Sequence, residues 1–336
     1  MRTEASLDQW GELYAVATRI KDLKPWEFLW DMDLIGVQTG EPEETVFFSI
    51  MGKGGGCYGI NVYEGYEGLN DFMMVTLQES MNLTVEYAMS HQKCLTCYWG
   101  NREELSEKQR KVIKELGYKY RGKDQWLYFM SFLPGFYPYN FDADEVIRMT
   151  GYLENLEMVL KYYTEQAVSV DFEHGNMFSA VYDEKKSTWQ FGEKELPFSA
   201  YQFHNLNIED EYLLEELAHA PKCELVLEAD IACLYSRVDD KAYDRPGSVA
   251  LCLVAEAVSG MMLKCELQQP GVDKIVSLAE EIIGFICEIG VPKEIRVSNI
   301  ILEAGLEQIC EVCGIKLRRV KKLRACSEFM EGFKRL

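Results

Sequence analysis

Acidic residues in the last third of the chain are spaced for chemistry on phosphodiesters. Glu228 and Asp230 are two residues apart on a predicted strand, so their side chains share one face of a sheet. Glu328 and Glu331 follow on the predicted C-terminal helix. Carboxylates from a strand and a later helix can hold two divalent ions, which stabilise the attacking and leaving oxygens of phosphodiester transfer. These four residues are the candidate catalytic set.

This set lacks one carboxylate. The predicted strand 293–298 ends in Ser298 and Asn299, where a two-ion enzyme would place its central acidic ligand. Two Mg²⁺ or Mn²⁺ ions need several hard oxygen ligands, so we expect the missing carboxylate to remove the metal site. Glu280 and Glu281 could also serve, although solvent-facing glutamates are common on amphipathic helices. We therefore predict no cofactor, and Mg²⁺ or Mn²⁺ is needed only if a nuclease alternative holds.

Cysteine and histidine spacing raises the question of a zinc site. His91, Cys94 and Cys97 form H-x-x-C-x-x-C, and Cys310 with Cys313 forms a second C-x-x-C. In structural zinc sites, two such pairs are separated by ~15 to 20 residues of sequence, whereas these pairs lie in different predicted domains. His91, Cys94 and Cys97 are the candidate metal ligands, and the alternative is that all these cysteines are buried free thiols.

The segment 126–141 is the most aromatic part of the chain. Aromatic rings give large apolar contact area, and some carry a polar tip, so such a segment can line a ligand cleft. Trp126, Phe136, Tyr137 and Tyr139 are the candidate ligand-binding residues. The alternative is that these rings pack against helices of their own domain.

A glycine-rich segment contains Gly54, Gly56 and Gly59, which satisfy the G-x-G-x-x-G pattern of dinucleotide-binding loops. That function requires a helix to begin at the last glycine, because the helix N-terminus binds the phosphates. The residues that follow, 60–63, alternate between β-branched or aromatic and polar types and predict a strand. The glycines are therefore predicted to form the turn of a β-hairpin, with no cofactor bound there.

Composition and charge limit the class of protein. The 336 residues exceed what one hydrophobic core usually serves, so two domains are expected. The formal net charge is −20, which disfavours nucleic acid except through the basic segment 316–336. The N-terminus has no signal-peptide pattern, no stretch is long enough to span a membrane, and the eleven cysteines read as free thiols. We expect a cytoplasmic protein that does not bind membranes.

The order of predicted elements indicates an α+β protein. Residues 1–200 are expected to form a mixed α+β domain that contains the glycine-rich hairpin. Residues 201–336 are expected to form a connecting helix and an α/β domain of order βββαβαβα, which is the order of the ribonuclease H-like fold. That analogy predicts the strand order 3-2-1-4-5, with the fifth strand parallel to the fourth. Fold analogy alone does not fix function.

Several segments together resemble a family of uncharacterised bacterial proteins built from two domains of unknown function. The resemblance covers nearly the whole chain. It implies a two-part architecture and no catalytic residue. An aromatic residue expected soon after Arg245 and Pro246 is replaced by Gly247 and Ser248. The segments that carry the resemblance are SIMGKGGGCYGINVYEGYEGL, CLTCYWGNREELSEKQRKVIKELGYKYRGK, LPGFYPYNFDADEV, LEADIACL and RPGSVALCLVAEAVSGMMLKCEL.

Three functions remain open. The leading hypothesis is a non-catalytic binding or regulatory protein with a degenerate ribonuclease H-like module, because the element order is complete while the carboxylate set is not. The first alternative is a metal-dependent nuclease or transposase-related enzyme. The second is a small-molecule binder that uses the aromatic segment. The sequence leaves the partner open, and a protein partner is compatible with all of these features.

Overall fold

The computed structural model describes residues 2–203 and 205–333, which form two compact units of an α+β protein. The first unit comprises Met1–Thr76, Gln92–Leu133 and Pro138–Tyr201. The second comprises Leu77–His91, Pro134–Tyr137 and Gln202–Leu336. Two short segments from the first half of the sequence therefore group with the C-terminal unit. The division into domains 1–200 and 201–336 stays a prediction.

In the described residues of the first unit, seven strands form one mixed sheet of order β5-β4-β3-β2-β1-β6-β7. Neighbouring strands are antiparallel except β1 and β6, which are parallel. The strands are β1 (Ile35–Gln38), β2 (Val46–Met51), β3 (Tyr58–Glu64), β4 (Cys94–Gly100), β5 (Trp126–Phe132), β6 (Asn176–Asp183) and β7 (Thr188–Glu195).

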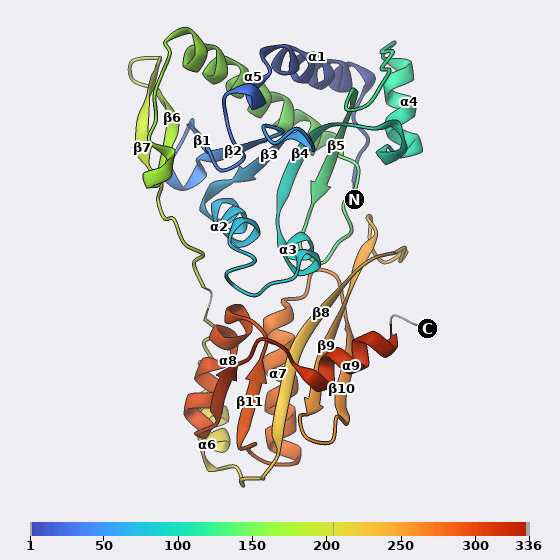
Figure 1. Ribbon diagram of the computed structural model, residues 1–336, viewed down its shortest axis with the longest axis vertical. Helices are drawn as coiled ribbons and strands as arrows, with labels where there is room; N and C mark the ends of the chain where they lie inside the picture. The colour runs from blue at the N-terminus through green and yellow to red at the C-terminus, as the bar shows by residue number, and fades with distance from the viewer. Residues whose placement is uncertain (1, 204, 334–336) are drawn as a thin grey trace. The chain divides into compact units, whose positions relative to one another are not determined.

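Helices cover both faces of this sheet, with α1 and α5 on one side and α2 on the other (Figure 1). The main core lies between the sheet and the helices α1 and α5, where Leu13, Ile20, Leu153 and Leu160 are fully buried. The helices are α1 (Leu7–Leu23), α2 (Gly65–Thr76), α4 (Glu107–Glu115) and α5 (Ala143–Glu165).

The glycine-rich segment is a hairpin turn, as its context predicts. β2 and β3 pair antiparallel on either side of it, with Met51 opposite Gly59. Gly52 and Gly55 have φ values of 128° and 85°, which side-chain-bearing residues rarely adopt. The segment therefore turns the chain, and no helix begins at its last glycine.

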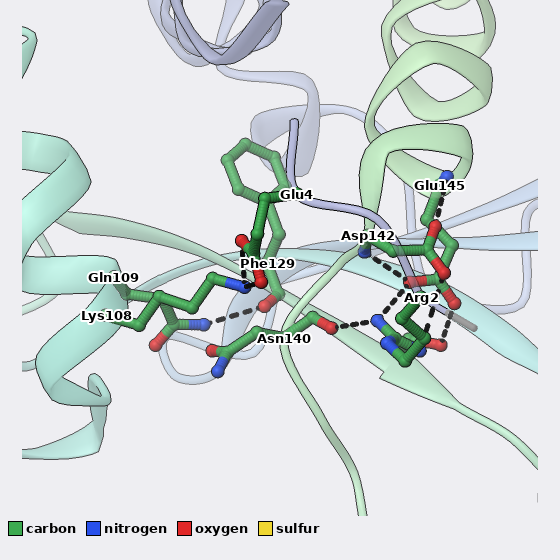
Figure 2. Close-up of polar contacts among 9 residues, drawn as sticks. Arg2, Glu4, Lys108, Gln109, Phe129, Asn140, Asp142 and Glu145 are labelled. Carbon is green, nitrogen blue, oxygen red and sulfur yellow. Dashed lines mark hydrogen bonds and ion pairs between the residues drawn. The ribbon is translucent and has the colours of Figure 1, made fainter. Parts of the chain in front are cut away.

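A buried polar network fixes the start of α5 (Figure 2). The Glu145 carboxylate accepts hydrogen bonds from Arg2 Nη2 at 2.8 Å and from Ser131 Oγ at 2.6 Å. It also accepts one from Asp142 N at 2.8 Å, while the Asp142 carboxylate accepts from Glu145 N, so the two residues form a capping box. Arg2 also donates to Asn140 O. These contacts tie the N-terminal segment to the helix.

In the described residues of the second unit, five strands form a sheet of order β10-β9-β8-β11-β12. β8, β11 and β12 are parallel, and β9 and β10 are antiparallel to their neighbours. The strand order 3-2-1-4-5 predicted from the sequence is therefore observed. The strands are β8 (Val226–Val238), β9 (Gly247–Glu256), β10 (Met262–Gln268), β11 (Glu294–Val297) and β12 (Lys316–Arg319).

Helices pack on both faces of this second sheet, with α7 and α9 on opposite sides (Figure 1). α9 contributes Ala325 and Cys326 to a core with Leu251 and Leu253. Gly305 allows α8 to approach α7 closely, since a Cβ there would lie 2.3 Å from Ile275 Cγ2. The helices are α3 (Val85–His91), α6 (Glu211–His219), α7 (Lys274–Glu288), α8 (Ile300–Cys313) and α9 (Arg324–Phe333).

Two local predictions differ from the structure. The periodicity of 102–116 predicts one helix, but a 3-10 turn over Arg102–Glu104 precedes α4, because Ser106 and Gln109 form a capping box that starts a new helix. The segment 80–91 has no strong sequence pattern, yet it contains α3. Among the described residues, no helix combines the length and apolar character needed to cross a membrane.

Candidate functional site

Glu228 has a structural role. It is 2% exposed, and its carboxylate accepts hydrogen bonds from the first main-chain N–H groups of α9. The donors are Arg324 N at 3.0 Å, Ala325 N at 2.7 Å and Cys326 N at 3.2 Å. These N–H groups have no partner within the helix, and the helix dipole favours a negative charge there. Glu228 therefore anchors α9 to β8.

Asn299 has a similar structural role at the end of β11. Its Oδ1 accepts hydrogen bonds from Ile301 N at 3.1 Å and Leu302 N at 3.0 Å, so it is the N-cap of α8. Its Nδ2 donates to Ser298 Oγ at 3.2 Å. The position where the sequence lacks a central carboxylate is therefore occupied by a helix-capping amide.

Asp230 lies two residues beyond Glu228 and has a different environment. Its Oδ1 accepts a hydrogen bond from Ser298 Oγ at 2.9 Å. Desolvation by the surrounding protein raises the pKa of Asp230, whereas the hydrogen bond from Ser298 acts in the opposite direction. The side chain is half-buried and borders a pocket. Of the two candidate carboxylates on β8, Asp230 is therefore the one that borders a pocket.

The pocket at Asp230 has a volume of about 430 Å³ and belongs to the second unit. Residues 230–234 of β8 form one side, and Ser298 and Asn299 lie at the end of β11. Asn82 to Tyr87 line a second side, where Asn82 Nδ2 donates to Ser298 O at 2.6 Å. Residues 321–323 and the α9 residues Cys326, Ser327, Met330 and Glu331 complete the lining.

Two lysines at this pocket differ from the other basic residues of their segment. Lys316 and Arg318 pair with Glu294 at 2.8 and 4.0 Å. Arg319 pairs with Glu303 at 3.3 Å and Arg324 with Glu328 at 2.9 Å. Within the described part of 316–336, Lys321 and Lys322 are exposed and form no ion pair. Lys334 and Arg335 lie outside the described residues. Lys321 and Lys322 therefore bring to the pocket positive charge that no ion pair neutralises, while Glu86, Asp230 and Glu331 also line it.

Two family models match this chain over most of its length. Residues 10–180, just over half of the chain, match the family model described as domain of unknown function DUF7309. The chain belongs to this family. Residues 213–334 match a second domain of unknown function, DUF6930. No curated protein matched the chain. The resemblance to a family built from two domains of unknown function is therefore confirmed.

The pocket lies in the unit that contains the DUF6930 region, and so do the remaining candidate carboxylates. Glu331 lines the pocket, whereas Glu328 is exposed and paired with Arg324. Glu281 pairs with Lys264 at 3.3 Å. In the described parts of the chain, no group of three or more His, Cys, Asp or Glu residues is placed to hold a metal ion. The catalytic assignment of these carboxylates stays a prediction.

The aromatic candidates do not converge on this pocket. In the DUF7309 region, Trp126 packs against the Tyr120 ring at 6.1 Å, and Arg2 lies over the Tyr139 ring. Phe136 and Tyr137 group with the second unit, where Phe136 contacts the Tyr243 ring at 5.6 Å. Tyr137 N donates to Pro246 O at 2.9 Å. Their ligand-binding role stays a prediction.

The candidate metal ligands are divided between the two units. His91 ends α3 in the second unit, whereas Cys94 and Cys97 lie on β4 in the first. Burial lowers the pKa of His91 to about 3 and raises that of Cys94 to about 12. Cys97 belongs to the main core. His204 lies outside the described residues. These environments favour a neutral imidazole and protonated thiols.

The sequence points to Asp230 and to the basic segment 316–336, but it does not single out Lys321 and Lys322 or place Leu77–His91 at the pocket. The lysines stand in a long basic run, and only the pairing of their neighbours separates them. The segment 77–91 has no strong periodicity, so nothing in it indicated that it lines a pocket with β8. The signal in the sequence was that Lys321 and Lys322 come just before the start of α9.

Proposed function

We propose that this chain is a binding protein whose C-terminal unit is a ribonuclease H-like module that recognises an anionic ligand. The observation that carries this proposal is the Glu228 carboxylate, which is fully engaged by the N–H groups that begin α9. A carboxylate held in this way supports the fold and is not available to a metal ion. The observed strand order supports the ribonuclease H-like assignment.

The pocket defines the class of ligand. Lys321 and Lys322 supply positive charge at the rim, and Asp230 can accept a hydrogen bond inside. A volume of about 430 Å³ suits a small organic molecule or a few residues of a peptide. The ligand is therefore expected to carry a phosphate or carboxylate for the lysines and an amine, amide or hydroxyl for Asp230.

Isothermal titration calorimetry tests this function. The probes are AMP, glucose 6-phosphate, citrate and pools of acidic peptides, each compared with a neutral counterpart such as adenosine or glucose. At least one anionic probe is expected to bind, and Lys321→Gln/Lys322→Gln is expected to weaken it about tenfold. Lys185→Gln/Lys186→Gln is the matched control, because it removes two adjacent exposed lysines of the first unit. Equal loss in both variants, or no binding of any probe, contradicts the proposal.

A nuclease assay distinguishes the enzymatic alternative. Single- and double-stranded DNA and RNA are incubated with the protein in Mg²⁺ or Mn²⁺. Under the proposed function no cleavage is expected. Cleavage that is abolished by Asp230→Asn would establish the metal-dependent nuclease instead.

We also propose that the protein works in the cytoplasm. All eleven cysteines are free thiols, which fits a reducing compartment. Fractionation of cells that express the full chain tests this placement, and recovery with membranes or outside the cell would contradict it.

A further inference from the structure

One edge of β8 has no strand partner along much of its length. β8 runs over Val226–Val238, but β11 pairs only with its first residues, ending at Val297 opposite Ala229. β9 continues along the other edge of β8 past this point. Figure 1 shows β8 extending beyond the end of β11. Among the described residues, no strand takes the place of β11 beside 230–234. An unpaired edge of this kind is a template for another strand.

The register identifies the main-chain groups that face this open edge. Ala257 N donates to Val226 O at 2.8 Å, so the main chain of Val226 faces β9. Main-chain groups alternate along a strand, and the pairing of β8 with β9 is regular from Leu227 to Leu234. Ile231 and Cys233 therefore direct main-chain groups toward the open edge, where the N–H of Ile231 donates to the Asp230 carboxylate. Ile231 and Cys233 are two residues apart, or roughly 7 Å, which is the repeat of an extended peptide.

The pocket lies along this edge, because every residue from 230 to 234 lines it. On one face of β8, Ala232 and Leu234 pack on the cluster that includes α9. On the other face, Cys233 lies beside Ser90 of α3, and both Glu86 and Tyr87 line the pocket. The open edge is thus enclosed between a helix on each face.

We propose that this pocket binds an extended peptide segment of a partner protein, which adds as a strand to β8 beside Ile231 and Cys233. The inference rests on the proposed function and names its ligand. Main-chain hydrogen bonds would provide affinity, and side-chain pockets would provide selectivity. An acidic side chain of the peptide fits Lys321 and Lys322. A basic, hydroxyl or amide side chain fits the carboxylates that also line the pocket, Asp230, Glu86 and Glu331.

A peptide library tests the inference on the full chain. The probe is a positional-scanning library of acetylated, fluorescein-labelled hexapeptides, with binding followed by fluorescence polarisation. We expect selection of Asp or Glu at one position and of Ser, Thr, Asn, Lys or Arg at another. Lys321→Gln/Lys322→Gln is expected to weaken the selected peptide about tenfold, and Lys185→Gln/Lys186→Gln to leave it unchanged.

Backbone methylation of the selected peptide tests strand addition without altering the protein. One derivative is N-methylated at alternate residues, and a second carries the same number of methyl groups on the other residues. Only the nitrogens that face β8 donate to it, so one derivative should lose at least about tenfold in affinity while the other loses little. Amide hydrogen exchange should also slow at Cys233 when the peptide binds. Equal losses in both derivatives would overturn strand addition.

The outcomes separate this inference from the proposed function. If no peptide pool binds while AMP or citrate binds in a manner that depends on Lys321 and Lys322, the anion site stands and the peptide inference is wrong. If neither peptides nor small anions bind, both fail. A selected peptide that binds the Lys321→Gln/Lys322→Gln variant as tightly as the unmodified chain refutes the assigned site.

Discussion

Each unit of the molecule contains a carboxylate that is at least half-buried. The two carboxylates differ in their hydrogen-bond partners and in the size of the cavity that they border. Glu145 in the first unit is 6% exposed and is bonded by Arg2, Ser131 and the Asp142 main chain. Asp230 in the second unit has Ser298 as a hydrogen-bond partner and borders a pocket of about 430 Å³. A smaller cavity of about 80 Å³ touches Glu145.

The difference separates structural polar groups from candidate binding groups. A buried carboxylate whose oxygens are bonded by several donors stabilises the native arrangement of those donors. A carboxylate that borders open space still has acceptor capacity to offer to a ligand. Glu228 belongs with Glu145 by this criterion, although it is only two residues from Asp230. Position in a sheet alone therefore does not identify a functional carboxylate.

Removing Glu145 should have the largest effect on stability. Glu145→Ala removes the carboxylate that accepts hydrogen bonds from Arg2 Nη2 and Ser131 Oγ, and it deletes half of the capping box of α5. We expect the free energy of unfolding to fall by about 3 kcal/mol, as measured by urea denaturation. Glu4→Ala is the control, because Glu4 is exposed and pairs with Lys108 at the surface. A similar loss of stability in both variants would contradict the distinction between a buried, bonded carboxylate and an exposed one.

Glu228→Ala should have the next largest effect. It leaves the N–H groups of Arg324, Ala325 and Cys326 without their acceptor beside a buried strand. The expected loss is about 2 kcal/mol, with increased proteolysis or amide exchange in α9. Glu331→Ala in the same helix is the control and should change the stability by less than about 0.5 kcal/mol. If proteolysis and amide exchange in α9 are unchanged in Glu228→Ala, packing alone holds the helix in place.

Glu294 extends the comparison to a carboxylate partnered by charges. Hydrogen bonds from Lys316 and Arg296 lower its pKa to about 2, below the ordinary value of about 4.3. Its stabilising contribution is therefore present above about pH 4 and is lost as the pH falls toward 2. Because Lys316 is exposed, we expect Glu294→Gln to cost only about 1 kcal/mol at neutral pH. Urea denaturation across this pH range should show that the difference in the free energy of unfolding between Glu294→Gln and the unmodified chain becomes smaller in acid.

The order of elements along the second unit could be predicted from the sequence because its signals are local, and the strand order 3-2-1-4-5 followed from the fold analogy. Strands of β-branched residues alternate with helices that begin at strong caps, such as Asp273 and Asn299. The hairpin at the glycine-rich segment follows in the same way, since a strand succeeds the last glycine. Local patterns therefore fixed the elements and their order.

The site was less predictable because its chemistry depends on contacts between distant residues. Lys316 is neutralised because β12 lies beside β11 and brings it to Glu294, whereas Lys321 follows the strand and escapes such pairing. Glu228 and Asp230 look equivalent by spacing, and only the placement of α9 separates them. The inclusion of Leu77–His91 in the second unit is likewise a tertiary property.

Asp230→Asn should have the smallest effect on stability of these substitutions, and its sign should depend on pH. Because burial raises the pKa of Asp230 in the folded chain, the unmodified protein loses stability from this group as the pH rises above about 3.9. Asparagine does not ionise and can still accept from Ser298 Oγ. The variant should therefore lie within about 1 kcal/mol of the unmodified chain, with its relative stability increasing toward neutral pH. A loss of 2 kcal/mol or more, as expected for Glu228→Ala, would place Asp230 with the structural carboxylates and remove the main reason for treating its pocket as a site.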